Sequence, residues 1–232
     1  MKKLAALLIA LNVVAMTAAT YSSPRPADPY AADIALTKEY SRFQDSTTGK
    51  FGYKHNGRIV IPAKYYWTGS FSEGLASVYT GKYGFIDKSG TLVIPAKYDN
   101  AWNFSEGLAR VTTDGRCGFI DKSGALIIPA EYDWAGKFSD GLAKVKTDGK
   151  YGFIDKSGAL VIPAEYDWAE YFCEGLAKVK TDGKCGYIDK SGALIIPAKY
   201  DDAWPFRNGK AKVVLNGRWF YIDRNGNELT RR

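Results

Sequence analysis

Short runs of alternating apolar and polar residues follow one another along most of the chain, and turn-forming residues separate them. The run "LAKVK" shows the pattern, because Ala143 and Val145 are expected on one face of a strand and Lys144 and Lys146 on the other. Runs of this period bounded by Gly, Asp and Ser predict β-strands. We therefore expect an all-β fold built from many short strands.

The same three runs return every 34 residues. One copy reads "YGFID", the turn "KSG", the run "ALVIPA", a turn-rich segment such as "EYDWAGKFSDG", and then "LAKVK". The starting residues of the full copies are Lys50 (a divergent copy), Lys82, Arg116, Lys150 and Lys184, and a half-copy starts at Arg218. Five copies and a fragment at a fixed period predict a tandem repeat array.

Tight turns predict how the strands of a copy are joined. Asp-Gly pairs such as Asp148-Gly149 separate "LAKVK" from the next "YGFID", and this dipeptide favours a type I′ hairpin with positive φ at both residues. With the "KSG" turn, this gives a three-stranded antiparallel meander, for example residues 108–132. The segment "YD-x-A-x-x-F" then crosses to the next unit. We expect it to form one helical turn, capped by the aspartates Asp99, Asp133, Asp167 and Asp201.

The ends of the array bear on whether it closes. The first unit, from Phe51, lacks its first strand, whereas the last unit, Lys210–Leu229, has all three. A propeller closed by a shared strand would need an incomplete last unit, so an open superhelical array is favoured over a closed β-propeller. An open array needs a cap, and the apolar spacing in Tyr30–Phe43 predicts a capping helix there.

The two termini complete the predicted organisation. Lys2, Lys3, an apolar run and Thr17-Ala18-Ala19 are typical of a secretory signal peptide over residues 1–19, cleaved near Ala19. Residues 20–49 then hold a linker and the capping helix, residues 51–229 the array, and residues 230–232 a tail. We expect an exported protein, periplasmic or extracellular, with no membrane span once the signal is removed.

Charge argues against one class of partner. The net charge of +7 falls to +5 when Lys2 and Lys3 leave with the signal, and acidic residues are interleaved with the lysines throughout. A nucleic-acid site would instead gather basic residues into a patch or stripe. No nucleic-acid partner is expected.

The repeat pattern "[WYC]-G-[FY]-I-D-K-x-G-x-x-[VI]-I-P-x-x-Y-D-x-A-x-x-F-x-[ED]-G-L-A-x-V" resembles the bacterial WG repeat, also called the KWG repeat. The resemblance covers Phe51 to Leu229. The name-giving Trp is Tyr or Cys in most copies and survives as Trp219, where Phe220 follows in place of Gly. The resemblance implies an all-β repeat protein, often exported, that acts as an interaction module. The resemblance implies no catalytic residues in this chain.

The sequence offers little for catalysis or metal binding. His55 is the single histidine, and a turn position makes a catalytic role improbable. Aspartates such as Asp121 and Asp155 recur before each "KSG" turn, where they are expected to bind the turn backbone. Cys117, Cys173 and Cys185 occupy repeat columns that elsewhere hold Tyr, Trp or Ser, and we expect them to be unpaired. We predict no enzyme, no cofactor and no metal.

The crossover segments carry the candidate contact residues. Tryptophan recurs in two columns of these segments, and the residues are Trp67, Trp134 and Trp168 in one column and Trp102 and Trp204 in the other. They either fill gaps between units or contact a ligand. The leading hypothesis is a scaffold that binds another protein. The alternative is a module that binds carbohydrate or cell wall through these tryptophans.

Overall fold

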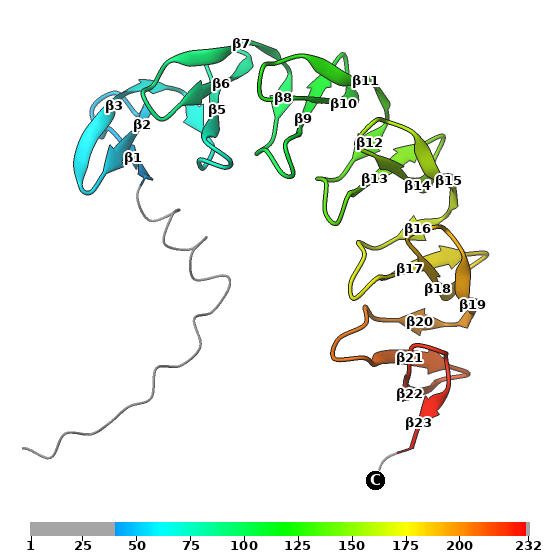
Figure 1. Cartoon of the computed structure of the whole chain (residues 1–232). Coiled ribbons are helices and arrows are strands. Elements are labelled where there is room, and N and C mark those ends of the chain that lie inside the picture. Colours follow the sequence, from blue (N-terminus) through cyan, green and yellow to red (C-terminus); the bar gives the residue numbers. More distant parts are fainter. Residues whose placement is uncertain (1–39, 231–232) are drawn as a thin grey trace, which may run out of the picture.

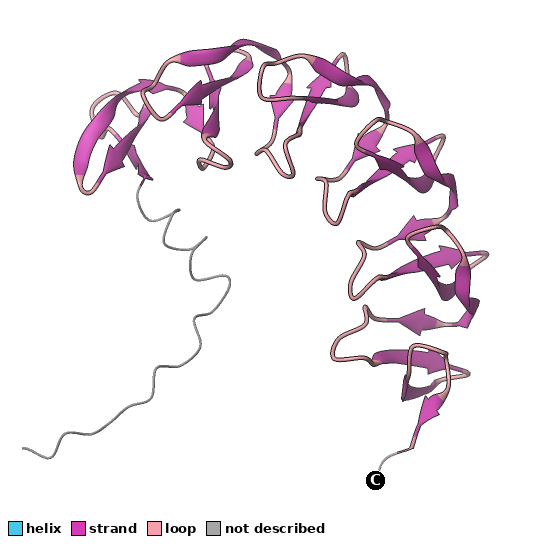
Figure 2. Ribbon diagram, in the orientation of Figure 1, coloured by secondary structure: helices cyan, strands magenta, loops and turns pink. Residues whose placement is uncertain are grey.

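The computed structural model describes residues 40–230, which form six antiparallel sheets placed one after another along an arc (Figure 1). Figure 2 shows strands and loops throughout this part of the chain, without a helix. The two ends of the arc do not meet, so the array is open (Figure 1). The all-β class, the tandem repeats and the open form predicted from the sequence are confirmed.

Each sheet corresponds to one unit, and we number the sheets from the N-terminus. Sheet 1 contains β1 (Tyr40–Gln44), β2 (Phe51–His55) and β3 (Arg58–Tyr65). Sheet 2 contains β4 (Trp67–Thr68), β5 (Leu75–Tyr79), β6 (Tyr83–Asp87) and β7 (Leu92–Tyr98). Sheet 3 contains β8 (Asn100–Ala101), β9 (Ala109–Thr113), β10 (Arg116–Ile120) and β11 (Leu126–Tyr132).

The remaining sheets repeat this order. Sheet 4 contains β12 (Trp134–Ala135), β13 (Leu142–Thr147), β14 (Lys150–Asp155) and β15 (Leu160–Tyr166). Sheet 5 contains β16 (Trp168–Ala169), β17 (Leu176–Thr181), β18 (Lys184–Asp189) and β19 (Leu194–Tyr200). Sheet 6 contains β20 (Asp202–Ala203), β21 (Ala211–Leu215), β22 (Arg218–Ile222) and β23 (Glu228–Leu229).

The predicted meander and its Asp-Gly hairpin are confirmed in sheet 4. β13 pairs antiparallel with β14, with Thr147 opposite Lys150, and β14 pairs with β15. The turn residues Asp148 and Gly149 both have positive φ, 49° and 80°, as a type I′ turn requires. The local sequence therefore sets both the strands and the reversal between them.

The helical turn predicted for the crossover is wrong. Trp134 and Ala135 extend the sheet instead, because the Asp133 amide donates to Lys146 O at 3.0 Å and the Gly136 amide donates to Lys144 O at 2.7 Å. The crossover then reverses in another tight hairpin, in which Asp140 and Gly141 have φ of 57° and 83°. Pairing with β13 satisfies the backbone N–H and C=O groups of this segment, which in a helix would have bonded to one another.

The predicted helix-capping role of Asp99, Asp133, Asp167 and Asp201 is wrong for the same reason. Asp167 accepts the amide of Asp182, in the next Asp-Gly hairpin, at 2.9 Å, and it pairs with Lys150 at 2.5 Å. Asp201 repeats the arrangement with Asn216 and Lys184. Together, these contacts hold the pKa of both carboxyls below their usual range. Asp99, Asp167 and Asp201 thus tether the following hairpin.

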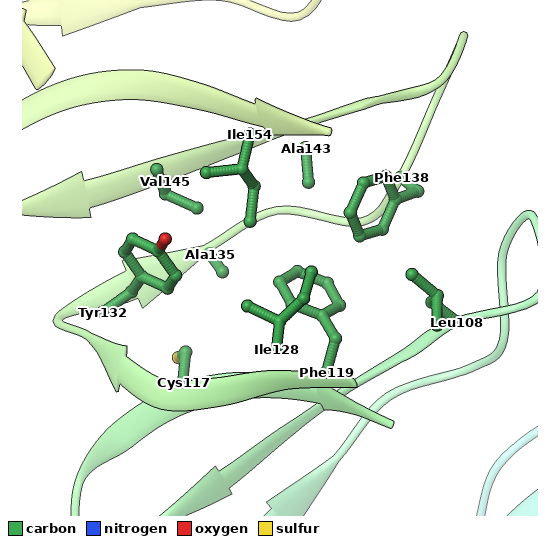
Figure 3. Packing of buried hydrophobic residues seen from close by; sticks show 10 residues of the cluster. All are labelled: Leu108, Cys117, Phe119, Ile128, Tyr132, Ala135, Phe138, Ala143, Val145 and Ile154. Carbon is green, nitrogen blue, oxygen red and sulfur yellow. The ribbon is translucent and has the colours of Figure 1, made fainter. Parts of the chain in front are cut away.

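The hydrophobic core consists of a series of junctions between consecutive sheets. At the junction of sheets 3 and 4, Phe119 and Ile128 of one sheet pack against Val145 and Ile154 of the other, and Phe138 of the crossover fills the space between them (Figure 3). The crossover Phe column is part of this core, as predicted, with Phe104, Phe138 and Phe206 buried and Phe71 and Phe172 partly buried. Each sheet is therefore stabilised by its neighbours.

The N-terminal cap differs from the prediction. Tyr40–Phe43, the end of the predicted helix, belongs to β1, which pairs antiparallel with β2 over Tyr40–Gln44 and Phe51–His55. β1 thus supplies the strand that the first unit lacks, so the helix prediction is wrong for these residues. The rest of the predicted helix and the predicted signal peptide lie outside the described residues.

Candidate functional site

The crossover tryptophans lie at the junctions between sheets and remain partly exposed. Trp67, Trp102, Trp168 and Trp204 are each about 40% exposed, and Trp134 is half-buried. Trp168 packs edge-on against Tyr151 of the preceding sheet at 5.2 Å, and its indole N–H donates to Glu170 at 3.0 Å. These rings therefore pack at the junctions and also keep an accessible part, and contact with a ligand stays a prediction.

Lys144 shows what fills the junction of sheets 4 and 5. It lies on β13, is 4% exposed, and donates to Ala169 O of the next sheet at 2.6 Å. Its ammonium lies 4.7 to 5.3 Å from the centroids of four rings, Trp134, Tyr151, Trp168 and Tyr171. Burial lowers the pKa of Lys144. A cation surrounded by aromatic faces is stabilised by their quadrupoles, so this junction is closed by its own side chain.

The residue equivalent to Lys144 differs from sheet to sheet. The position is held by Ser77, Arg110, Lys144, Lys178 and Lys212 in sheets 2 to 6. Arg110 also reaches the next sheet, where it donates to Ala135 O. Ser77 is too short to reach the corresponding carbonyl, Ala101 O. The junction of sheets 2 and 3 therefore lacks the long cationic side chain found in the later sheets.

A groove with a volume of about 640 Å³ lies at this junction and extends along the array. Its lining begins at Arg42 on β1, includes Ser77, and ends at Tyr171 in the crossover of sheet 5. Its aromatic residues are Trp67, Tyr83, Trp102, Trp134 and Tyr171. The structure thus brings three of the five predicted tryptophans into one groove, whereas Trp168 lines a smaller cavity of about 460 Å³ and Trp204 lies beside Lys212 in sheet 6.

Arg110 forms the floor of the groove. Its guanidinium carbon lies 3.4 Å from the Trp102 ring centroid and 5.6 Å from that of Trp134. Desolvation lowers the pKa of Arg110. A guanidinium group is nevertheless charged at neutral pH in proteins. Four residues that line the groove were not identified from the sequence, namely Arg42, Ser77, Arg110 and Tyr171. The sequence signal that could have revealed the groove is Ser77, which stands in a repeat column that elsewhere holds a basic residue.

A second surface, which we call the aliphatic rim, was also missed. Two aliphatic residues at or near the start of the last strand of sheets 1 to 5 are 37% to 58% exposed, and they are Ile59-Val60, Leu92-Val93, Leu126-Ile127, Leu160-Val161 and Leu194-Ile195. These strands, β3, β7, β11, β15 and β19, follow the outer edge of the arc (Figure 1). Each contains an exposed Pro, such as Pro163, which only an edge strand tolerates.

The titratable residues have structural partners. Asp121 accepts the Ser123 hydroxyl at 2.6 Å and the Ala125 amide at 3.0 Å, and these bonds hold its pKa below the usual range. This confirms the predicted role of the aspartates before the "KSG" turns. Partly buried His55 ends β2 and contacts the Tyr40 ring, with a centroid distance of 4.8 Å.

The cysteines and the remaining chemistry give no further candidate. Cys117, Cys173 and Cys185 are free, as predicted. Cys173 donates to Phe206 O at 3.0 Å, as Ser105 donates to Phe138 O at 2.9 Å, which explains the exchange of Cys and Ser in that column. Within residues 40–230, no group of three or more His, Cys, Asp or Glu is placed to hold a metal ion. No helix there is suited to cross a membrane.

The repeats identified from the sequence also match a known family model. The family model described as WG containing repeat matches residues 53–82, 83–117, 118–151, 151–185 and 186–219. No curated protein matches the sequence.

Among the solved structures that match this chain, two serve as examples. A crystal structure of a eukaryotic initiation factor is 14% identical, with a TM-score of 0.51, over 84% of this chain and 62% of that one. Kluyveromyces lactis Hsv2p is 13% identical, with a TM-score of 0.45, over 80% of this chain and 73% of that one. The chain thus spans about 62% of the length of the first of them, and at these identities the likeness concerns the fold alone.

Proposed function

Because the chain belongs to the WG-repeat family, we propose that it is an exported, non-enzymatic scaffold that binds a partner protein along its aliphatic rim. The observation that carries this proposal is the recurrence of two exposed aliphatic residues on the edge strand of five consecutive sheets. Soluble proteins seldom expose large apolar side chains in a regular series, and such surfaces mark interaction sites.

The rim suits a protein because its chemistry is purely apolar and its sites are repeated. Leu126 and Leu160 are 55% and 49% exposed and occupy the same position in consecutive units. A partner that presents apolar residues along an extended surface would contact several units at once, and each contact adds to the total affinity. The absence of side-chain hydrogen-bonding groups at these positions favours a protein over a sugar.

The rim is tested by photo-crosslinking in the cells that naturally produce the protein. A photoreactive residue is placed in turn at Leu126, Leu160 or Leu194, with Asp140 as the matched exposed position in the crossover hairpin. We expect one and the same protein to be captured from the three rim positions and not from Asp140. Burial of the leucines in the complex is the physical reason.

The double variant Leu126→Lys/Leu160→Lys supplies the functional control. Exposed positions tolerate substitution, so its unfolding midpoint should stay close to that of the native chain, whereas capture from Leu194 should fall at least tenfold. Three results would refute the binding of a different protein on the rim. They are capture of a second copy of this chain, equal capture from Asp140, and capture that the double variant leaves unchanged.

Export is expected to remove residues 1–19, so that the mature chain starts at Thr20. The reason is the charged, apolar and small-residue order of the N-terminus. Intact-mass measurement on protein from the periplasm or the medium checks this. A mature protein that retains Met1–Ala19, or one found only in the cytoplasm, would contradict export.

A further inference from the structure

The groove at the junction of sheets 2 and 3 has a chemistry different from that of the rim. Its volume of about 640 Å³ lies within the ~300–1,000 Å³ range of ligand sites. It is open along several sheets, and its wall combines indole rings with the side chains of Ser77, Asn100 and Asn103. A surface of flat rings and dispersed hydrogen-bonding groups is suited to a ligand that is itself partly apolar and rich in hydroxyls.

Two buried polar atoms in the groove have no protein partner among residues 40–230. They are Oγ of Ser77, whose side chain is fully buried, and Nε of Arg110. Leaving a buried donor or acceptor unpaired is destabilising, so native proteins rarely do so without a reason. Both atoms belong to residues that line the groove, so a ligand that displaces the side chains covering them would pair with them.

The charged residues of the groove indicate the charge of its ligand. Arg42, Arg110 and Lys137 line it, and none of the lining residues is acidic. The Arg110 guanidinium lies over the Trp102 ring and is held there by the bond that Nη1 donates to Ala135 O. A planar guanidinium is the side chain best matched to a carboxylate. The groove therefore favours an anion over a cation.

The comparison with sheet 4 shows that this groove is a property of one junction. Lys144 fills the equivalent position there and lies among Trp134, Tyr151 and Trp168. Ser77 stands in its place beside Trp67 and Tyr83, two rings that pack edge-on with centroids 5.8 Å apart. A single exchange of a long cation for a serine thus opens the site without disturbing the repeat.

We propose that this groove binds an acidic oligosaccharide, with sugar rings against Trp102 and Trp67 and a sugar carboxylate at Arg110. The lining of the groove, which spans several sheets, fits a chain of sugars. The indoles fit the apolar faces of the sugar rings, and the three cations fit the carboxylates. This function is independent of the rim, because the two surfaces share no residue.

Calorimetric titration of the purified chain with hexagalacturonate tests the proposal. Maltohexaose serves as the neutral sugar and hexaglutamate as the acidic peptide. We expect saturable binding of hexagalacturonate, with maltohexaose and hexaglutamate each at least tenfold weaker. Maltohexaose binds more weakly because it cannot form the ion pair with Arg110, and hexaglutamate binds more weakly because it has no sugar rings to stack.

Two variants and one control locate the site. Ser77→Lys should weaken hexagalacturonate binding at least tenfold, because the new ammonium would occupy the groove as Lys144 occupies its own junction, while the circular dichroism spectrum stays native. Trp102→Ala should weaken binding by a similar factor. Trp204→Ala removes the matched tryptophan in sheet 6, outside the groove, and should change the affinity less than twofold.

Several results would overturn the proposal. Absence of saturable hexagalacturonate binding would refute it outright, and so would binding that Ser77→Lys and Trp102→Ala leave unchanged. Maltohexaose binding of equal strength would refute the acidic specificity. Hexaglutamate binding of equal strength, lost in Trp102→Ala, would assign the groove to acidic peptides instead.

Discussion

Replacing Gly152 by alanine is expected to lower the free energy of unfolding by about 3 kcal/mol. Gly152 lies on β14 within the first of two shifts in the pairing register with β15. A Cβ at this position would lie 2.5 Å from Ile162 O and 2.7 Å from Ala164 N. These are backbone atoms of the neighbouring strand, so no side-chain rotation relieves the clash, and β14 and β15 must separate.

Urea unfolding together with amide hydrogen exchange measures this effect. We expect lost protection across β14 and β15, and a clearly lower unfolding midpoint. Gly149→Ala is the matched control, because Gly149 has a positive φ, 80°, but nothing lies within 4 Å of its Cβ position. Left-handed backbone strain alone should cost about 1–2 kcal/mol there. Equal losses in the two variants would contradict the close strand approach at Gly152.

Replacing Phe138 by alanine is expected to cost about 3–5 kcal/mol. Its ring is 1% exposed and packs edge-to-face against Phe119, with centroids 4.9 Å apart, between sheets 3 and 4 (Figure 3). The substitution removes most of the buried apolar surface that joins the crossover to both sheets. Phe138→Leu keeps part of this surface and should lose less than half as much.

Hydrogen exchange on the Phe138→Ala chain also tests the open architecture. In an open array each sheet contacts its neighbours alone, so protection should fall in sheets 3 and 4, while sheets 1 and 6 retain most of theirs. A closed ring would instead distribute the loss over all sheets. Uniform loss of protection from β1 to β23 would therefore contradict the arrangement in Figure 1.

The candidate surfaces were harder to anticipate than the fold. The tryptophans were identified from the sequence, but three of them share a groove because of Ser77, a small residue with no chemical signal of its own. The rim was missed because the run of three aliphatic residues in each repeat, such as "LVI" at 160–162, is typical of a buried strand. Only one of its three residues, such as Ile162, is buried, since β15 is an edge strand with its first two residues exposed.

The sequence by itself determined the features that one repeat encodes locally. Strand alternation and the Asp-Gly turn predicted the meander because both depend on neighbouring residues, such as Val145 and Gly149. The crossover shows the limit. Trp134 and Ala135 become a strand because β13, several residues away, offers its carbonyls, and this pairing is non-local.

Only the tertiary structure decided which side chains meet across the junctions. Arg42 and Tyr171, which both line the groove, lie in sheets 1 and 5, and the curvature that places them there sums small rotations between sheets. No short stretch of sequence encodes that sum. The exposure of the rim likewise depends on which strand lies at the sheet edge.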